Sequence, residues 1–87
     1  MTVDLIEKFV ESKGHHNSAV AIHFRQRDSI TGLFVRGNDY EELKSKNFWR
    51  VVSRTRMEEW KKTGDIGLSR IFNGAEFTRL ADGLKKV

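Results

Sequence analysis

The sequence predicts a small α+β protein in which an N-terminal helix packs on a bent antiparallel sheet or small barrel of five or six strands. An apolar stripe with helical spacing occupies residues 3–13, and apolar and polar residues alternate in residues 18–27. The later apolar segments are joined by connections too short for the crossovers that parallel strands need. A chain of 87 residues suits one domain, so residues 1–87 are expected to fold as a single unit.

The helix predicted at 3–13 has one apolar face and suitable ends. Thr2 can cap its first turn, and Gly14 suits the position after its last residue. Its apolar residues fall at positions i, i+1, i+4 and i+5, which form one stripe: Leu5, Ile6, Phe9 and Val10.

Two strands are predicted next, at about 18–27 and 30–36. In the first, Val20, Ile22 and Phe24 alternate with polar or small residues and should face the core. Gly32 interrupts the second strand, and a glycine at such a position often marks a bulge or a sharp bend.

The two segments at 39–46 and 55–62 have weaker patterns. The first begins with an Asp and has a Glu three residues later, which resembles a capping pair for one helical turn, and a short edge strand is the alternative. The second opens with the capping box Thr-Arg-Met-Glu and is predicted to be a short helix.

A third strand is predicted at 48–54. Trp49 and Val51 should face the core, and the opposite face should carry Arg50, Val52 and Arg54.

The last two strands are predicted at 68–72 and 75–80, and residues 81–87 should form a frayed tail. The dipeptide Asn73-Gly74 lies between them, and Asn-Gly between two β-prone runs strongly indicates a hairpin turn. The sequence therefore predicts that these two strands pair with each other.

Composition narrows the function classes. The chain has no cysteine, no basic-then-apolar leader and no apolar run of membrane-spanning length, which favours a cytoplasmic protein without membrane contact. It has no nucleotide-binding glycine motif, and its one histidine cluster, His15-His16, lacks further ligands. We therefore expect no catalytic residues, no cofactor and no metal, and hence no enzyme.

The basic residues suggest where a partner could bind. Residues 1–49 are electrically neutral, whereas residues 50–87 carry nine basic and five acidic side chains and so hold the whole net charge of +4. The sequence favours a small non-catalytic protein-interaction or structural module whose partner is an unknown protein or a second copy of itself. The alternative is binding of single-stranded RNA or DNA through a basic face, with these contact residues: Arg50, Arg54, Arg56, Arg70 and Arg79.

Part of the chain resembles the Sm-like small barrel, an RNA-binding variant of the SH3-like fold. The segment 19–24 matches the alternating first strand of the first Sm motif, Gly32 the glycine of its second strand, and Asp39 the aspartate of its following loop. The resemblance covers roughly residues 3–54 and implies a small β-barrel. The Met-Asn that follows this aspartate in the family is missing, and Asn73-Gly74 stands where the family has Arg-Gly, so the uridine-binding residues of the family do not carry over.

Overall fold

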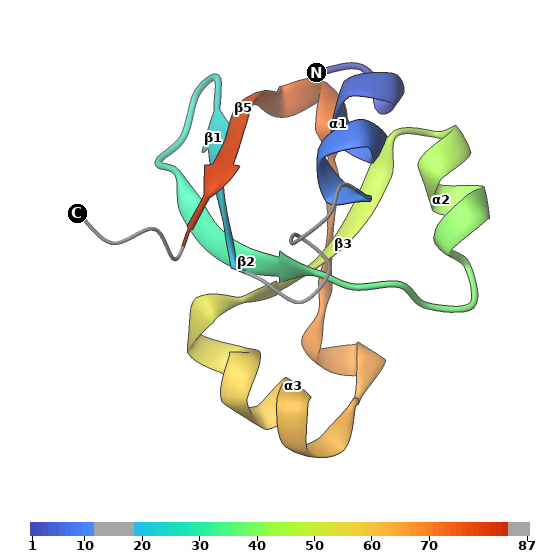
Figure 1. Cartoon of the computed structure of the whole chain (residues 1–87), viewed down its shortest axis with the longest axis vertical. Coiled ribbons are helices and arrows are strands. Elements are labelled where there is room, and N and C mark those ends of the chain that lie inside the picture. Colours follow the sequence, from blue (N-terminus) through green and yellow to red (C-terminus); the bar gives the residue numbers. More distant parts are fainter. Residues whose placement is uncertain (12–18, 84–87) are drawn as a thin grey trace.

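The structure, a computed structural model, describes residues 1–11 and 19–83 (Figure 1). Five strands and three α-helices fold over these residues, with short 3-10 turns before α3, after α3 and before β5. In chain order the main elements are α1 (Val3–Val10), β1 (Val20–Phe24), β2 (Ile30–Phe34), α2 (Tyr40–Ser45), β3 (Phe48–Ser53), α3 (Met57–Thr63), β4 (Arg70–Asn73) and β5 (Phe77–Asp82).

The strands form one antiparallel sheet in the order β4-β3-β2-β1-β5. The predicted α+β class, the antiparallel sheet and the N-terminal helix are confirmed. The sheet is curved, so that Phe24 of β1 lies against Phe72 of β4 with ring centroids 5.9 Å apart. It is not closed into a barrel, because β4 and β5 are its two edges and do not pair with each other.

The predicted hairpin at Asn73-Gly74 is therefore wrong. The Asn73 side chain accepts a hydrogen bond from the Ala75 amide at 2.9 Å and begins the 3-10 turn Gly74–Glu76, which carries the chain across to the other edge of the sheet. Gly74 does not have the positive φ that a tight hairpin turn requires. A glycine fits at position 74 because it has no side chain: a Cβ atom there would stand 2.6 Å from Ile6 Cδ1 and 2.8 Å from Trp49 Nε1.

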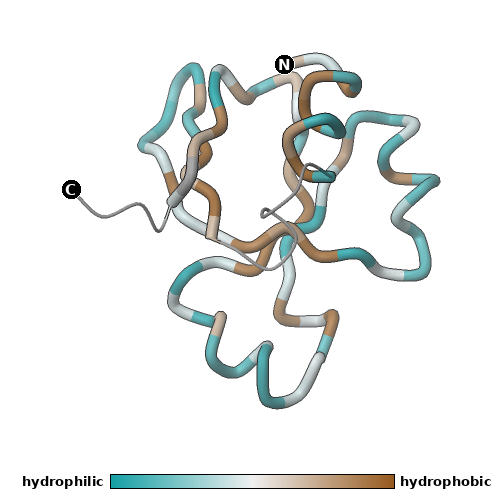
Figure 2. Tube along the Cα trace, in the orientation of Figure 1, coloured by the Kyte–Doolittle hydropathy of each residue, from teal (hydrophilic) through white to brown (hydrophobic). Residues whose placement is uncertain are grey.

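The main core lies on the concave face of the sheet, beneath α1. Figure 2 shows hydrophobic residues gathered along the strands and on the inward side of α1. The inward positions predicted for β1 and β3 are confirmed, since Val20, Ile22, Trp49 and Val51 are all buried. Burying side chains of this size stabilises the fold by about 1.5–3 kcal/mol each, before the entropy of ordering them is counted.

The convex face has a second, smaller core, because α3 covers it from the side opposite α1 (Figure 1). Met57 and Trp60 of α3 pack against Val52 and its neighbours Leu33 and Val35. Val52 was expected on the arginine-bearing face outside the core, but it is fully buried. The alternation of β3 is regular, and both of its faces are covered.

The structure defines where the three helices begin and end. The ambiguous segment at 39–46 is the helix α2, although Asp39 makes no side-chain capping bond there. The predicted capping box of α3 is also absent, because Thr55 lies in the 3-10 turn Arg54–Arg56 and its hydroxyl faces Ser53 at 3.1 Å. Helix α1 ends at Val10.

Several sequence predictions fall outside the described residues. They are the continuation of the first helix to residue 13, the role of Gly14, the His15-His16 pair, the start of the first strand at residue 18, and the part of the predicted tail beyond residue 83. The beginning of that tail, predicted as frayed from residue 81, is instead the end of β5, which continues to Asp82.

Gly32 allows two strands to approach closely and does not mark a bulge. Its pairing with Val20 of β1 and Ser53 of β3 is regular, and a Cβ atom there would stand 2.9 Å from the Val52 carbonyl oxygen. The register shift lies instead in the pairing of β1 with β5, between His23 and Phe24.

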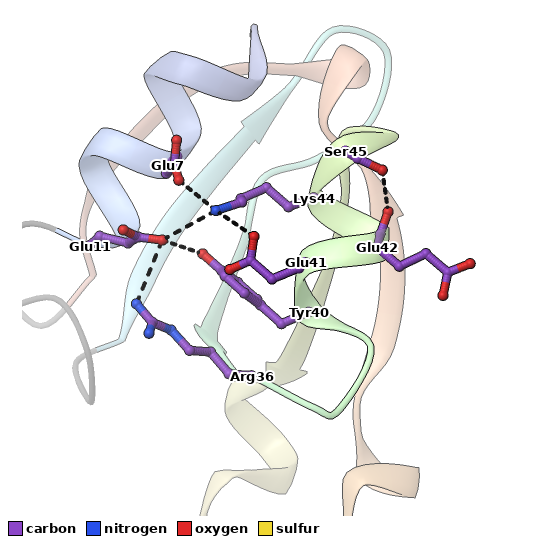
Figure 3. Close-up of polar contacts among 8 residues, drawn as sticks. All are labelled: Glu7, Glu11, Arg36, Tyr40, Glu41, Glu42, Lys44 and Ser45. Carbon is purple, nitrogen blue, oxygen red and sulfur yellow. Dashed lines mark hydrogen bonds and ion pairs between the residues drawn. The ribbon is translucent and has the colours of Figure 1, made fainter.

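A polar network joins α1 to α2 (Figure 3). Lys44 lies 2.6 Å from a Glu7 carboxylate oxygen and 3.1 Å from Glu41, and these hydrogen bonds raise the pKa of its ammonium group. The Tyr40 hydroxyl donates to Glu11 at 2.8 Å. Burial, reinforced by this bond, raises the pKa of Tyr40 to about 12.

Candidate functional site

A groove with a volume of about 430 Å³ opens at one end of the concave face. Its floor is apolar, its rim carries three arginines, and two hydroxyls and a glycine complete it. We call it the arginine groove; it is lined by Arg27, Ile30, Val51, Ser53, Thr55, Arg56, Gly67, Leu68, Arg70 and Phe72.

Strand register explains why basic and apolar side chains meet there. On β3 and β4, Trp49 pairs with Phe72 and Val51 pairs with Arg70, so the inward row passes from the core to the groove within two residues. The 3-10 turns on either side of α3 then supply Arg56 and Leu68 as the groove walls. The groove is thus the open end of the same curved surface whose other end is closed by α1.

Aromatic rings orient one of the arginines. The guanidinium carbon of Arg27 lies 4.9 Å from the centre of the Phe24 ring and 5.8 Å from that of Phe72. Both distances are within the range of cation–π attraction. Phe72 is itself half-buried, so one part of its ring supports the core and another part borders the groove.

Among the residues that the structure describes, no aspartate or glutamate lines the groove. Arg27, Arg56 and Arg70 are exposed, and across residues 1–11 and 19–83 none of them forms an ion pair with a carboxylate. An arginine presents five N–H donors and no acceptor. Three of them around an apolar floor favour an anionic ligand that also has a flat apolar part.

Of the five arginines predicted from the sequence, only Arg56 and Arg70 lie in the groove. Arg54 is exposed in the same 3-10 turn as Arg56 but does not line it. Arg79 lies on β5, where its guanidinium is 3.2 Å from the His23 ring.

Arg50 is occupied elsewhere. It lies 2.8 Å from one Asp39 oxygen and 3.2 Å from the other, and it also donates to the Ser69 hydroxyl at 3.2 Å. The hydrogen bonds from Arg50 lower the pKa of Asp39. This bidentate pair fixes the start of α2 to β3 and leaves Arg50 no role in the groove.

Sequence reasoning missed Arg27 because it was assigned to the end of the first strand. The strand ends at Phe24, and Arg27 lies in the connection to β2. The signal that could have placed it is the run Arg-Gln-Arg-Asp-Ser, which is wholly polar and marks a loop. Loops at the open end of a sheet are common positions for binding residues.

A smaller cavity of about 240 Å³ lies where α1, α2 and α3 approach β2. Its lining is mostly aromatic and apolar, includes Tyr40, Trp49 and Trp60, and also contains Arg36. Two of these rings and Arg36 already have polar partners, since Tyr40 donates to Glu11, the Trp49 indole donates to Asn47 at 2.8 Å, and Arg36 lies 3.7 Å from Glu11. It therefore has few groups that could orient a polar ligand.

The remaining chemistry of the described part of the chain is limited. No group of three His, Cys, Asp or Glu side chains that could hold a metal ion occurs in residues 1–11 and 19–83. Within the same ranges, no helix is both long enough and apolar enough to traverse a lipid bilayer.

Comparison with known proteins gave no match: no family model, curated protein or solved structure corresponds to this chain.

Proposed function

We propose that this protein is a non-catalytic module that binds single-stranded nucleic acid in the arginine groove. The observation that carries the proposal is the convergence of Arg27, Arg56 and Arg70, all without carboxylate partners in the described residues, around a floor that includes the half-buried ring of Phe72. Arginines would hold phosphates, and an aromatic ring would stack with a base.

The apolar floor favours a single strand over a duplex. Stacking on Phe72 requires a base whose face is free, and bases in a duplex are stacked on each other. The hydroxyls of Ser53 and Thr55, which lie in the same groove, offer further hydrogen bonds to sugar or base.

Titration of a labelled single-stranded RNA and a DNA of the same sequence tests the proposal. If the groove arginines contact phosphate, the logarithm of the affinity should fall with the logarithm of the salt concentration, with a slope of about −0.7 for each phosphate charge neutralised. Replacing Arg56 or Arg70 with glutamine should weaken binding and make this slope shallower by about 0.7.

Arg54→Gln is the matched control, because Arg54 belongs to the same 3-10 turn as Arg56 but lies outside the groove. It removes the same charge and should change affinity much less than Arg56→Gln. No binding to either strand at low salt would refute the proposal. Equal losses in the two variants would show diffuse attraction without a groove site.

A second candidate is association with another protein strand, including a second copy of this chain. It is favoured by the sheet edges at β4 and β5, which pair with no further strand among the described residues, and by Ile71 on β4, which is 49% exposed. Sedimentation over a range of concentrations tests self-association, and Ile71→Lys should abolish any dimer formed at this edge. A monomer at every concentration would remove the self-association form of this candidate.

We also propose that the architecture is related to the Sm-like and SH3-like small barrels and that the protein acts in the cytoplasm. The support for the architecture is the helix α1, the β1–β2 hairpin with Gly32 in its second strand, and the curvature that brings Phe24 against Phe72. An experimental structure with a strand order different from β4-β3-β2-β1-β5 would contradict it.

A further inference from the structure

We infer that the arginine groove holds the terminal phosphomonoester of a nucleic-acid strand and not an internal phosphodiester. This inference rests on the proposed function and specifies its ligand. Two observations lead to it: the three arginines line one small volume, and two of the other arginines that the sequence suggested, Arg50 and Arg79, do not extend that volume into a path.

Charge balance favours a monoester. A phosphodiester carries one negative charge, whereas a terminal phosphate carries about −1.5 to −2 at neutral pH and has three strong acceptor oxygens. The groove, at about 430 Å³, is near the lower end of the 300–1,000 Å³ typical of small-molecule sites. Three guanidinium groups around such a volume match one doubly charged group with several acceptors better than one diester.

The distribution of the other arginines argues against a continuous track. A protein that follows an internal segment presents cations along a groove that extends past each nucleotide. Here Arg50 is bound to Asp39, and Arg79 lies on β5 beside His23, so neither continues the arginine groove. Beside the groove, the Gly67 amide donates to the Asp65 carboxylate at 2.9 Å, which places a negative charge next to a residue of the lining.

The floor then receives the terminal base. Phe72, Ile30 and Leu68 line the groove and are each only partly buried, so part of their apolar surface faces it, next to the Arg27 guanidinium that lies 5.8 Å from the centre of the Phe72 ring. A base at the end of a strand has only one stacked neighbour and can move onto an aromatic ring at lower cost than an internal base.

The test uses one short oligonucleotide sequence in four forms: with a 5′-phosphate, with a 3′-phosphate, with hydroxyls at both ends, and as a closed circle. We expect one of the phosphorylated forms to bind at least about tenfold more tightly than the hydroxyl-ended and circular forms. Arg56→Gln should abolish most of this preference, and Arg54→Gln should retain it.

The pH dependence gives an independent measurement. The second ionisation of a phosphomonoester has a pKa near 6, so the preference should grow severalfold between pH 5 and pH 7.5. Among the described residues, the ionisable groups that line the groove are the guanidinium groups of Arg27, Arg56 and Arg70, and the Asp65 carboxylate lies beside the rim. The hydroxyl-ended form should show no comparable change.

The outcomes separate this inference from the proposed function. Equal binding of all four forms would overturn the inference and leave single-strand binding intact. No binding of any form would overturn both. A mononucleotide with the same terminal phosphate serves as a competitor: if it binds as tightly as the oligonucleotide, the phosphomonoester site is supported and the proposed nucleic-acid ligand is wrong.

Discussion

The replacement of Gly74 with alanine tests the packing at the junction between β4 and β5. The added Cβ atom would stand 2.6 Å from Ile6 Cδ1 and 2.8 Å from Trp49 Nε1, and it would also meet the Asn47 side chain. Overpacking of this kind costs about 1–3 kcal/mol. The Asn47 carboxamide accepts the Trp49 indole hydrogen bond at 2.8 Å, and displacing it would cost about 1 kcal/mol more.

We therefore expect Gly74→Ala to lower the free energy of unfolding by about 2–4 kcal/mol, a large part of the roughly 4–13 kcal/mol typical of a domain this size. Urea denaturation, monitored by tryptophan fluorescence, measures this loss of unfolding free energy. Gly64→Ala is the control, since Gly64 has φ of 66° and open space around it, so its cost should be only about 1 kcal/mol of backbone strain. A loss at Gly74 no larger than that at Gly64 would refute the packing argument.

Three further predictions concern the polar contacts and the second core. Tyr40 is the chain's single tyrosine, so absorbance at 295 nm should report its ionisation near pH 12 in the folded protein. Because the fold favours the neutral form, the stability that Tyr40 contributes should be lost as pH rises from 10 to 12. Glu11→Gln should lower the pH at which half of Tyr40 is ionised. An ionisation midpoint near pH 10 in the wild-type protein would contradict this prediction. Asp39→Asn should destabilise the protein at neutral pH, because Arg50 holds the pKa of Asp39 below its ordinary 3.8. The difference in unfolding free energy from the wild type should shrink as pH falls below 3.8, where Asp39 begins to be protonated. A constant difference down to pH 2 would exclude this ion pair as the cause. Val52→Ala should cost about 2 kcal/mol in thermal or urea unfolding, since Val52 is fully buried beneath α3; a loss below 0.5 kcal/mol would mean that α3 does not cover it in solution.

Sequence patterns predicted the fold where the signal was local. Alternation placed Val20 and Ile22 of β1 in the core, and helical spacing located α1, because both patterns follow directly from backbone periodicity. Sequence reasoning failed where distant residues decide the structure. Asn73-Gly74 has the composition of a tight turn, but Gly74 is required by the space left by Ile6 and Trp49, and no local pattern reports that space.

The same distinction applies to the site. Arg56 and Arg70 were among the contact residues predicted from the sequence, and both line the arginine groove. Arg50 was predicted with them because nothing near it in sequence shows its partner, Asp39. Arg27 was missed because the curvature of the sheet, not sequence proximity, brings the β1–β2 connection to the groove. Convergence of side chains from separate loops is a property of the tertiary structure.

The pairing of β5 with β1 also determines how the chain must assemble. β1, β2 and β3 are joined by contacts between neighbours in sequence and can form early, whereas β5 pairs Asp82 with Val20 across most of the chain and brings Phe77 and Leu80 into the core. Contacts of such long sequence separation slow folding, because the loop must close before they stabilise anything. During synthesis at roughly 5–20 residues per second, the ribosome therefore holds a chain whose core lacks two large side chains and whose β1 edge is unpaired until β5 emerges.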